Sequence, residues 1–272
     1  MKFKLSLNIP SVEESSMEQN NSRKIETPSS SNLRLPSGYR FVKVLGSGAF
    51  GQVVKAIDEK DGTIVAIKLQ RFSEHSRIFK KEIANLKKIA DSCDNLVCIR
   101  DSGLFYKKHY IVMDFIPGQT LTEYAEKNNN LELIFKELIK SLKKLHSKGF
   151  AHMDVKPDNI IISENSKVYL VDLGISCFDN KCIGGTKKFL PPDLSFGDIS
   201  VKERQRADVW AIGLSFARSI GQSDYAKKVT EQILNDLPTS DIPKNLKISP
   251  YLKKVLRLLD VSKKRMTIFK QL

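Results

Sequence analysis

The segment spanning residues 39–69 constrains the fold more than any other part of the chain. Its sequence, YRFVKVLGSGAFGQVVKAIDEKDGTIVAIKL, contains alternating and β-branched runs broken by glycines and by an Asp-Gly pair at 61–62. This pattern predicts three antiparallel strands, with the Asp-Gly pair closing the second hairpin. The G-x-G-x-x-G triplet at 46–51 then lies between two strands. A dinucleotide-binding fingerprint would instead lead from a strand into a helix, so the pattern disfavours that class of fold.

Beyond this segment the pattern becomes mainly helical. Apolar residues recur at helical spacing over 76–92, and the chain is broken by Pro117-Gly118. Between the helical pattern at 76–92 and the Pro117-Gly118 break, strand-like runs occupy 96–104 and 110–115. After the break, helices are predicted at 131–149, 206–220 and 251–260. The patterns together predict an α+β fold with two lobes. The first is small and β-rich with one main helix, and the second is larger and mainly helical.

The same patterns divide the chain into a tail and one folded domain. Residues 1–36 are polar, with no period that would bury a face, and we expect a flexible tail there. Residues 37–272 should form the domain, since apolar patterning begins near its start. Within it we expect an N-lobe at about 39–114, a hinge at about 114–119 and a C-lobe at about 120–272.

Charge and composition limit the partners of the chain. The 272 residues include 45 basic and 31 acidic side chains, which gives a net charge of +14 and favours an acidic protein substrate. The lysines are spread over many segments, so we expect no specific nucleic-acid site. No apolar run approaches about 18 residues, so we expect no membrane span. The first ten residues lack the long apolar stretch of a secretory signal, and we expect an intracellular protein, in the cytoplasm or nucleus.

The four cysteines form two C-x4-C pairs, Cys93 with Cys98 and Cys177 with Cys182. Zinc sites more often use C-x2-C with matching histidine spacing, which is absent here. Thiols of intracellular proteins stay reduced. We therefore expect free thiols, and a redox role for the Cys177/Cys182 pair is the alternative.

Seven signals follow one another in a fixed order. They are the glycine loop at 46–51, VAIK ending at Lys68, Glu82 in the next helix, AHMDVKPDN at 151–159, VDLG at 171–174, GGTKKFLPPD at 184–193, and ADVWAIG at 207–213 completed by Arg265. Lys68 precedes Glu82 by 14 residues, and Asp154 precedes Asp172 by 18. In this order the motifs resemble the signature of a eukaryotic-type Ser/Thr protein kinase domain, from about residue 39 to the C-terminus.

The resemblance implies how ATP and Mg²⁺ would be bound. Lys68 would hold the α- and β-phosphates and be oriented by Glu82. Asn159 and Asp172 would bind Mg²⁺, which prefers oxygen ligands. The other expected ATP contacts come from the glycine loop, the roof and floor of the adenine site and the hinge: Leu45, Gly46, Ser47, Gly48, Ala49, Phe50, Gly51, Val53, Ala66, Met113, Asp114, Ile116 and Ile161. Met113 falls at the gatekeeper position, where it can also be ordinary core filler.

The resemblance also implies the catalytic groups. Asp154 would accept the proton of the substrate hydroxyl or orient that hydroxyl, and Lys156 would neutralise charge on the γ-phosphoryl group as it transfers. Lys156 and Thr186 match the Ser/Thr pattern of the family. His152 would pack structurally, in an apolar stack with Leu173, Leu86 and Ile99.

Three positions depart from the family pattern. Met153 stands where an arginine usually precedes the catalytic aspartate, giving His-Met-Asp in place of His-Arg-Asp. In the family, that arginine normally binds a phosphate on the activation loop, which here is the segment from Asp172 to Asp193. Because Met153 cannot bind a phosphate in this way, we expect activity that does not depend on such a phosphate. Leu173 replaces phenylalanine beside the metal-binding carboxylate, and Asp193 replaces glutamate as the expected partner of Arg265. Asp208 should anchor the backbone of the catalytic loop.

The motifs favour an enzyme that transfers the γ-phosphoryl group of Mg·ATP to Ser/Thr hydroxyls of proteins. The alternative is an ATP-binding pseudokinase that acts as a scaffold. Pseudokinases typically lose one of four polar residues, all of which are present here: Lys68, Asp154, Asn159 and Asp172. A small-molecule kinase of related fold is a third reading, which GTKKFLPPD and the Asp208/Arg265 framework disfavour.

Overall fold

The computed structural model describes most of the chain from residue 33 onward. The described residues are 33–48, 50–90, 93, 95–128, 130–176, 185–192, 194, 199–234, 241–242, 246–259 and 262–272, without the side chains of 187, 233–234 and 262–265. The chain divides into two units, Met1–Leu33 and Arg34–Leu272, and all elements below belong to the second. The predicted tail therefore lies outside the described residues up to position 32.

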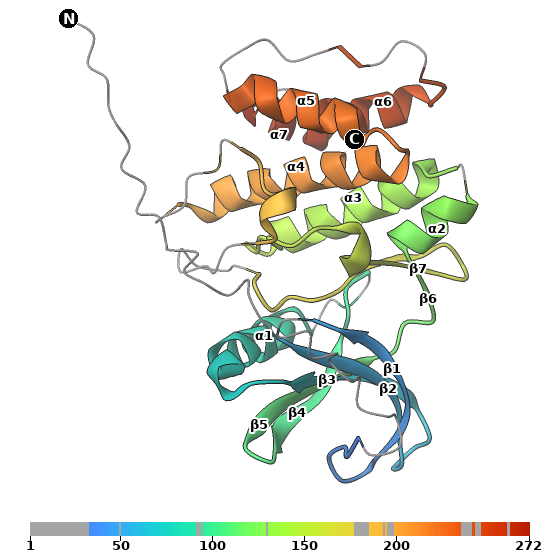
Figure 1. Cartoon of the computed structure of the whole chain (residues 1–272), viewed down its shortest axis with the longest axis vertical. Coiled ribbons are helices and arrows are strands. Elements are labelled where there is room, and N and C mark those ends of the chain that lie inside the picture. The colour runs from blue at the N-terminus through green and yellow to red at the C-terminus, as the bar shows by residue number, and fades with distance from the viewer. Residues whose placement is uncertain are drawn as a thin grey trace, which may run out of the picture. The chain divides into compact units, whose positions relative to one another are not determined.

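A five-stranded antiparallel sheet forms the first lobe (Figure 1). Its strands are β1 (Tyr39–Ser47), β2 (Gly51–Asp58), β3 (Ile64–Gln70), β4 (Ile99–Phe105) and β5 (Lys108–Asp114), in the order β1-β2-β3-β5-β4. The glycine loop joins β1 to β2, both of which are strands, as the sequence predicts. The register pairs Val53 with Lys68 across β2 and β3. Because paired residues of neighbouring strands share one face, these two side chains lie on the same side of the sheet.

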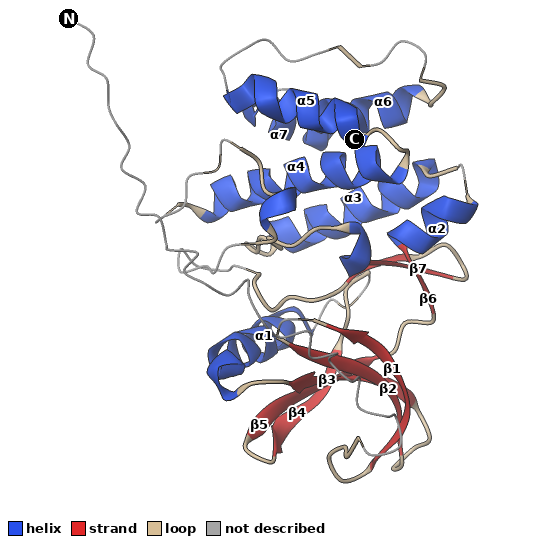
Figure 2. Ribbon diagram, in the orientation of Figure 1, coloured by secondary structure: helices blue, strands red, loops and turns tan. Residues whose placement is uncertain are grey.

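Helix α1 (Ser76–Ile89) packs beside this sheet (Figure 2). Its buried side chains recur every three or four residues, which is the spacing of one helical face. They are Phe79, Glu82, Asn85, Leu86 and Ile89. Two members of this buried face, Glu82 and Asn85, are polar and therefore need hydrogen-bond partners inside the protein.

The second lobe is mainly helical, which confirms the predicted fold class. Its helices are α2 (Leu121–Lys127), α3 (Glu132–Ser147), α4 (Val201–Ser219), α5 (Ser223–Leu234), α6 (Pro250–Leu256) and α7 (Ser262–Gln271). Short 3-10 turns lie in this lobe at Pro157–Asn159, Lys187–Phe189 and Arg257–Leu259, and another lies before α1 in the first lobe, at Ser73–His75. Capping boxes fix the starts of α2, at Thr120 with Glu123, and of α4, at Ser200 with Glu203. No helix in the described part of the chain combines the length and apolarity needed to span a bilayer.

The observed elements correct several predicted boundaries. Pro117-Gly118 does not simply break the chain, because β6 (Gly118–Thr120) starts there and pairs with β7 (Ile160–Ser163), which pairs with β8 (Val168–Leu170). Helix α4 begins five residues before the predicted segment, at its serine cap. The predicted helix at 251–260 ends at Leu256, and α7 follows it. Helices α2, α5 and α7 were not predicted.

One apolar core joins the two lobes. A single cluster of buried side chains includes Phe79, Leu86 and Ile111 from the strand-rich lobe and Leu173 and Trp210 from the helical lobe. Since interiors are packed closely, α1 and the segment around Leu173 are positioned by direct contact with the same core. Leu86 and Leu173 are members of this cluster, and Ile99 packs against it. The predicted stack also includes His152, which is fully buried, and the stack itself stays a prediction.

The expectation of free thiols is wrong at Cys93 and Cys98. These two residues form a disulfide, with their Cα atoms 5.4 Å apart. The chain turns tightly between them, since the Leu96 N–H donates to the Cys93 carbonyl and Asn95 has a left-handed backbone, with φ of 66°. Local turn geometry brings the sulfurs together, which the spacing alone did not indicate. The other pair, Cys177 and Cys182, lies outside the described residues.

Candidate active site

A buried lysine bridges two carboxylates where the lobes meet. Lys68 on β3 donates to Glu82 of α1, at 2.9 and 2.8 Å from the two carboxylate oxygens. Its Nζ also lies 2.8 Å from Oδ1 of Asp172. Lys68 and Glu82 are almost fully buried, whereas the Asp172 side chain is 37% exposed. Segments 104 residues apart in the sequence are thus connected through one ammonium group.

Sharing one cation between two carboxylates shifts all three pKa values. Burial raises the pKa of Glu82 to about 7; Lys68 opposes this and the nearby Asp172 adds to it. Burial alone would lower the pKa of Lys68, but the two carboxylates outweigh it and the pKa is raised. For Asp172, burial is outweighed by Lys68 and by the Gly174 N–H, so its pKa is lowered. Asp172 is therefore the firmly ionised carboxylate, and Glu82 is the one that takes a proton first.

The predicted catalytic residues form a second cluster. Lys156 donates to Oδ2 of Asp154 at 2.7 Å and to Oγ1 of Thr186 at 3.2 Å. Thr186 donates through both its hydroxyl and its N–H to Oδ1 of Asp154. Asn159 donates to Oδ2 and to the carbonyl oxygen of Asp154, at 2.8 and 2.9 Å. The carboxylate of Asp154 is thereby held by donors on both of its oxygens, with Lys156 and Asn159 on Oδ2 and Thr186 on Oδ1.

Asp208 is hydrogen-bonded to the backbone of the catalytic loop at residues 151–159. Its oxygens accept the N–H groups of His152 at 2.7 Å and of Met153 at 2.6 Å. This is the anchoring that the sequence predicted. His146 also contacts Asp208, with Nε2 at 2.8 Å from Oδ2. His146 was not among the predicted site residues, because a histidine near the end of a helix carries no local signal for a partner 62 residues away.

Two residues with strained backbone lie at this centre. Met153 has φ of 67° and Asp172 has φ of 66°, and neither is glycine. Such conformations cost free energy and persist where surrounding contacts enforce them. The hydrogen bonds of Asp208 to Met153 and of Lys68 to Asp172 are contacts of that kind. The fold thus holds the backbone at Met153 and at Asp172 in specific, unfavourable conformations.

The predicted metal ligands fit a hard cation. The side-chain Nδ2 of Asn159 is used within the loop, which leaves its Oδ1 as the oxygen available to a metal. Asp172 contributes an ionised and partly exposed carboxylate. Mg²⁺ commonly takes one or two protein oxygens and completes its shell with water and phosphate. An amide oxygen and a carboxylate are hard ligands, so this donor set suits Mg²⁺ better than a transition metal that prefers nitrogen or sulfur.

The glycine loop leaves space where a phosphate would lie. A Cβ atom added at Gly46 or Gly48 would meet no atom within 4 Å, whereas one at Gly51 would lie 2.3 Å from the Leu69 carbonyl oxygen. Gly51 is thus needed for the close approach of β2 to β3, whereas Gly46 and Gly48 border open space. Ala49 lies outside the described residues. Phe50 packs edge-on to His75 at the start of α1, with ring centroids 5.4 Å apart.

The predicted adenine contacts are apolar and only partly covered. Ala66 and Met113 are buried, Val53, Ile116 and Ile161 are half-buried, and Leu45 is 41% exposed. Ser47 accepts a hydrogen bond from Arg71. A set of incompletely covered apolar side chains beside a cationic lysine suits an aromatic base joined to phosphates.

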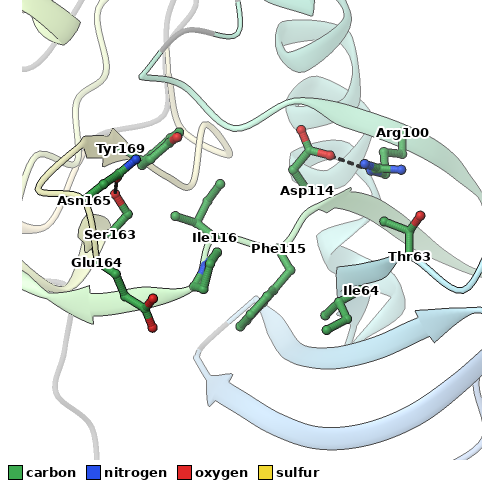
Figure 3. Close-up of a pocket in the computed structure, with 11 residues that line it drawn as sticks. Thr63, Ile64, Arg100, Asp114, Phe115, Ile116, Ser163, Glu164, Asn165 and Tyr169 are labelled. Carbon is green, nitrogen blue, oxygen red and sulfur yellow. Dashed lines mark hydrogen bonds and ion pairs between the residues drawn. The ribbon is translucent and has the colours of Figure 1, made fainter.

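A separate hollow lies beside the hinge (Figure 3). Its volume is about 560 Å³, and it is bordered by hinge residues 114–117, by the β7–β8 turn and by the start of β3. The side chain of Asp114 turns toward Arg100 and forms an ion pair with it. Asp114 and Ile116, two of the predicted ATP contacts, line this hollow, whereas Val53, Ala66 and Ile161 do not, so the hollow meets the predicted adenine site only at the hinge.

Met153 occupies an apolar environment. It is almost fully buried in a small cluster with Ala151, Ile175 and Ala207, against which Leu190 packs. Leu190 belongs to the GGTKKFLPPD motif. The predicted pair of Asp193 with Arg265 falls on residues whose side chains lie outside the described part of the chain.

Comparison with known proteins supports a family assignment. A family model described as "Protein kinase domain" matches residues 39–272. "Serine/threonine-protein kinase 4 homolog B" of Dictyostelium discoideum is 29% identical over 206 residues, which is 68% of this chain and 18% of that protein. "Probable serine/threonine-protein kinase PknB" of Lactococcus lactis is 30% identical over 194 residues, covering 65% and 30%, respectively. "Serine/threonine-protein kinase par-4" of Caenorhabditis briggsae is 27% identical over 254 residues, covering 84% and 39%.

The chain thus matches between 18% and 39% of the length of these three relatives. The matched region contains the lysine bridge and the catalytic cluster described above. Since the family model covers residues 39–272, the chain belongs to the protein kinase family.

Proposed function

We propose that this chain transfers the γ-phosphoryl group of Mg·ATP to serine or threonine hydroxyls of protein substrates. The observation that carries the proposal is the arrangement of Asp154, Lys156 and Thr186 in one hydrogen-bonded cluster. A scaffold that only binds nucleotide has no need of a carboxylate oriented by donors on both oxygens. Several relatives carry names that identify them as serine/threonine-protein kinases, which supports the same substrate class.

In the proposed reaction, bound Mg·ATP supplies the phosphoryl group and the metal that screens its charge. Asp154 receives the substrate hydroxyl and orients it, taking its proton as the oxygen attacks. Lys156, next to Asp154, lowers the cost of negative charge on the transferring group. Lys68, oriented by Glu82, binds the phosphates that remain on the nucleotide. Asn159 and Asp172 would hold the metal through their oxygens.

We further propose that this activity does not require a phosphate on the activation loop. Met153 stands where a phosphate-gripping arginine would be, and it is buried among alanine and isoleucine side chains. An apolar side chain offers a phosphate no charge-assisted hydrogen bond. Packing of Leu190 against this cluster supplies an alternative, apolar contact between the GGTKKFLPPD segment and the catalytic loop. The positive charge of the chain favours acidic protein substrates.

Transfer of labelled phosphate from ATP to generic protein substrates tests the proposal. Asp154→Asn should slow transfer by about 10²–10⁴-fold and Asp172→Asn should reduce it to background, while Asp158→Asn should leave it near wild type. Asp158 is a matched control, since it is an exposed aspartate of the same loop. Binding of ATP, measured separately, should survive Asp154→Asn. Binding of ATP by the wild type with no transfer above the Asp172→Asn background would instead support the scaffold alternative.

A further inference from the structure

The buried polar residue Asn85 contacts the segment that follows the metal-binding aspartate. Its Nδ2 donates to the carbonyl oxygen of Ser176 at 3.0 Å and to that of Leu173 at 3.3 Å. Asn85 is 4% exposed and lies three residues after Glu82, on the same buried face of α1. The helix that orients Lys68 through Glu82 is therefore also hydrogen-bonded to the segment that begins at Asp172.

The segment from Leu173 to Ser176 is bound on its other side as well. The hydroxyl of Ser176, which is fully buried, donates to the carbonyl oxygen of His152 at 3.0 Å. The Ser176 N–H closes a turn onto the Leu173 carbonyl at 3.2 Å. His152 in turn is held by Asp208. A continuous set of buried hydrogen bonds thus connects α1, the metal-binding segment, the catalytic loop and α4.

A polar side chain at position 85 needs a physical reason. The neighbouring buried residues of the α1 face, Leu86 and Ile89, pack into the apolar core. A leucine at position 85 would gain apolar burial without the cost of desolvating an amide. The amide offers what an apolar side chain does not, namely a directional contact that fixes one element against another. Both acceptors are backbone carbonyl oxygens, so these hydrogen bonds fix the backbone of the segment rather than one of its side chains.

We propose that Asn85 is a positioning residue that fixes the metal-binding segment relative to α1. This inference rests on the proposed kinase activity and explains how that activity can proceed without an activation-loop phosphate. With Asn85 in place, the carboxylates of Glu82 and Asp172 both stay within hydrogen-bond distance of Lys68 Nζ in the unphosphorylated protein. Without it, the apolar core still holds α1, but the segment bearing Asp172 loses its polar attachment to the helix.

The test compares the full chain with Asn85→Leu, which preserves approximate side-chain size and removes both donors. Hydrogen exchange of the peptide covering residues 171–176 is measured first, because it requires neither metal nor nucleotide. We expect hydrogen exchange in this peptide to be about tenfold faster in the variant, because the segment loses the equivalent of about one net hydrogen bond. Turnover should fall by about the same factor, and the Mg²⁺ concentration for half-maximal activity should rise, while ATP binding without metal stays within twofold.

Ser141→Ala is the matched control. Ser141 is equally buried and donates to the Glu137 carbonyl within α3, away from the metal-binding segment. It should lower stability without changing exchange at 171–176 or the Mg²⁺ dependence. If Asn85→Leu does not fold, Asn85→Ser takes its place in the same measurements, with the same expected results. Its hydroxyl is too short to reach both carbonyl oxygens.

Wild-type exchange at 171–176 together with wild-type Mg²⁺ dependence in Asn85→Leu would overturn the inference. Equal changes in Ser141→Ala would overturn it too, since they would reflect general destabilisation. All proteins are assayed after phosphatase treatment. If the treated wild type is itself inactive, the proposed phosphate independence is wrong, whereas the exchange comparison still decides whether Asn85 positions the segment.

Discussion

The raised pKa of Glu82 makes the stability of the fold depend on pH in a specific direction. Glu82 ionises with an ordinary pKa of 4.5 in an unfolded chain and with a pKa of about 7 in the folded protein, chiefly because it is buried. Between these values the unfolded chain has released the Glu82 proton and the folded protein still holds it. The free energy of unfolding must therefore fall as pH rises through this window.

The size of the effect follows from the two pKa values. At about 1.4 kcal/mol per pH unit, a change from 4.5 to about 7 corresponds to about 3 kcal/mol of unfolding free energy. The contribution is present in full below pH 4.5 and is lost by about pH 7. Lys68, whose pKa is raised, contributes stability that is constant over this window, because it is protonated in both states.

The perturbation is Glu82→Gln, which keeps the shape and removes the titration. Urea unfolding is measured from pH 4.5 to 7.5 for the wild type, for this variant and for Glu126→Gln, an exposed glutamate of α2. We expect the stability of the wild type relative to Glu82→Gln to decline by about 3 kcal/mol across the range. A constant difference between them would refute the reasoning, because Glu82 would then titrate alike in both states.

Three further changes probe the loop anchors. Asp208→Ala leaves the N–H groups of His152 and Met153 without acceptors. The free energy of unfolding, measured by urea titration, should therefore fall by about 4 kcal/mol. A loss below about 1 kcal/mol would contradict the anchoring role. Gly185→Ala places a Cβ 1.9 Å from the Met153 carbonyl oxygen, so turnover should fall while ATP binding, followed by nucleotide fluorescence, persists; wild-type turnover would show that the loop tolerates the shift. Met153→Arg buries a guanidinium among Ala151, Ile175 and Ala207 and should cost about 3 kcal/mol or more, seen as a lower melting temperature; unchanged melting would mean that the arginine escapes to solvent.

Local patterns in the sequence were sufficient for the strand-rich lobe. The alternation within residues 39–69 and the Asp-Gly turn are short-range signals, and they correspond to β1, β2 and β3. The period of α1 likewise placed Glu82 on the buried face. Strand β6 is only three residues long and exists because it pairs with β7, so no local pattern could indicate it. Helix α4 begins with a mostly exposed, charged stretch and is buried continuously only from Ala207 to Ala217, so the apolar run that indicated the helix starts well after the helix itself.

The site was predictable as far as the motifs reach. Lys68, Glu82 and Asp172 are in contact, and so are Asp154, Lys156 and Asn159. The motifs do not include His146, Asn85 or Ser176, whose partners are distant in the sequence or are backbone groups. The helical spacing of Asn85 from Glu82 was the one available signal, since it predicts burial of an amide that then requires acceptors. The Cys93–Cys98 disulfide depended on turn geometry in the same way.

We propose that Asp154 directs phosphoryl transfer to a protein hydroxyl and that the chain needs no activation-loop phosphate for it. The most direct test is the single-turnover rate of Mg·ATP-dependent transfer to serine and threonine peptides, measured on phosphatase-treated protein. We predict that the treated wild type transfers phosphate at the untreated rate, and that Asp154→Asn is slower by about 10²–10⁴-fold. An equal rate in Asp154→Asn, or loss of activity on phosphatase treatment, would contradict the account.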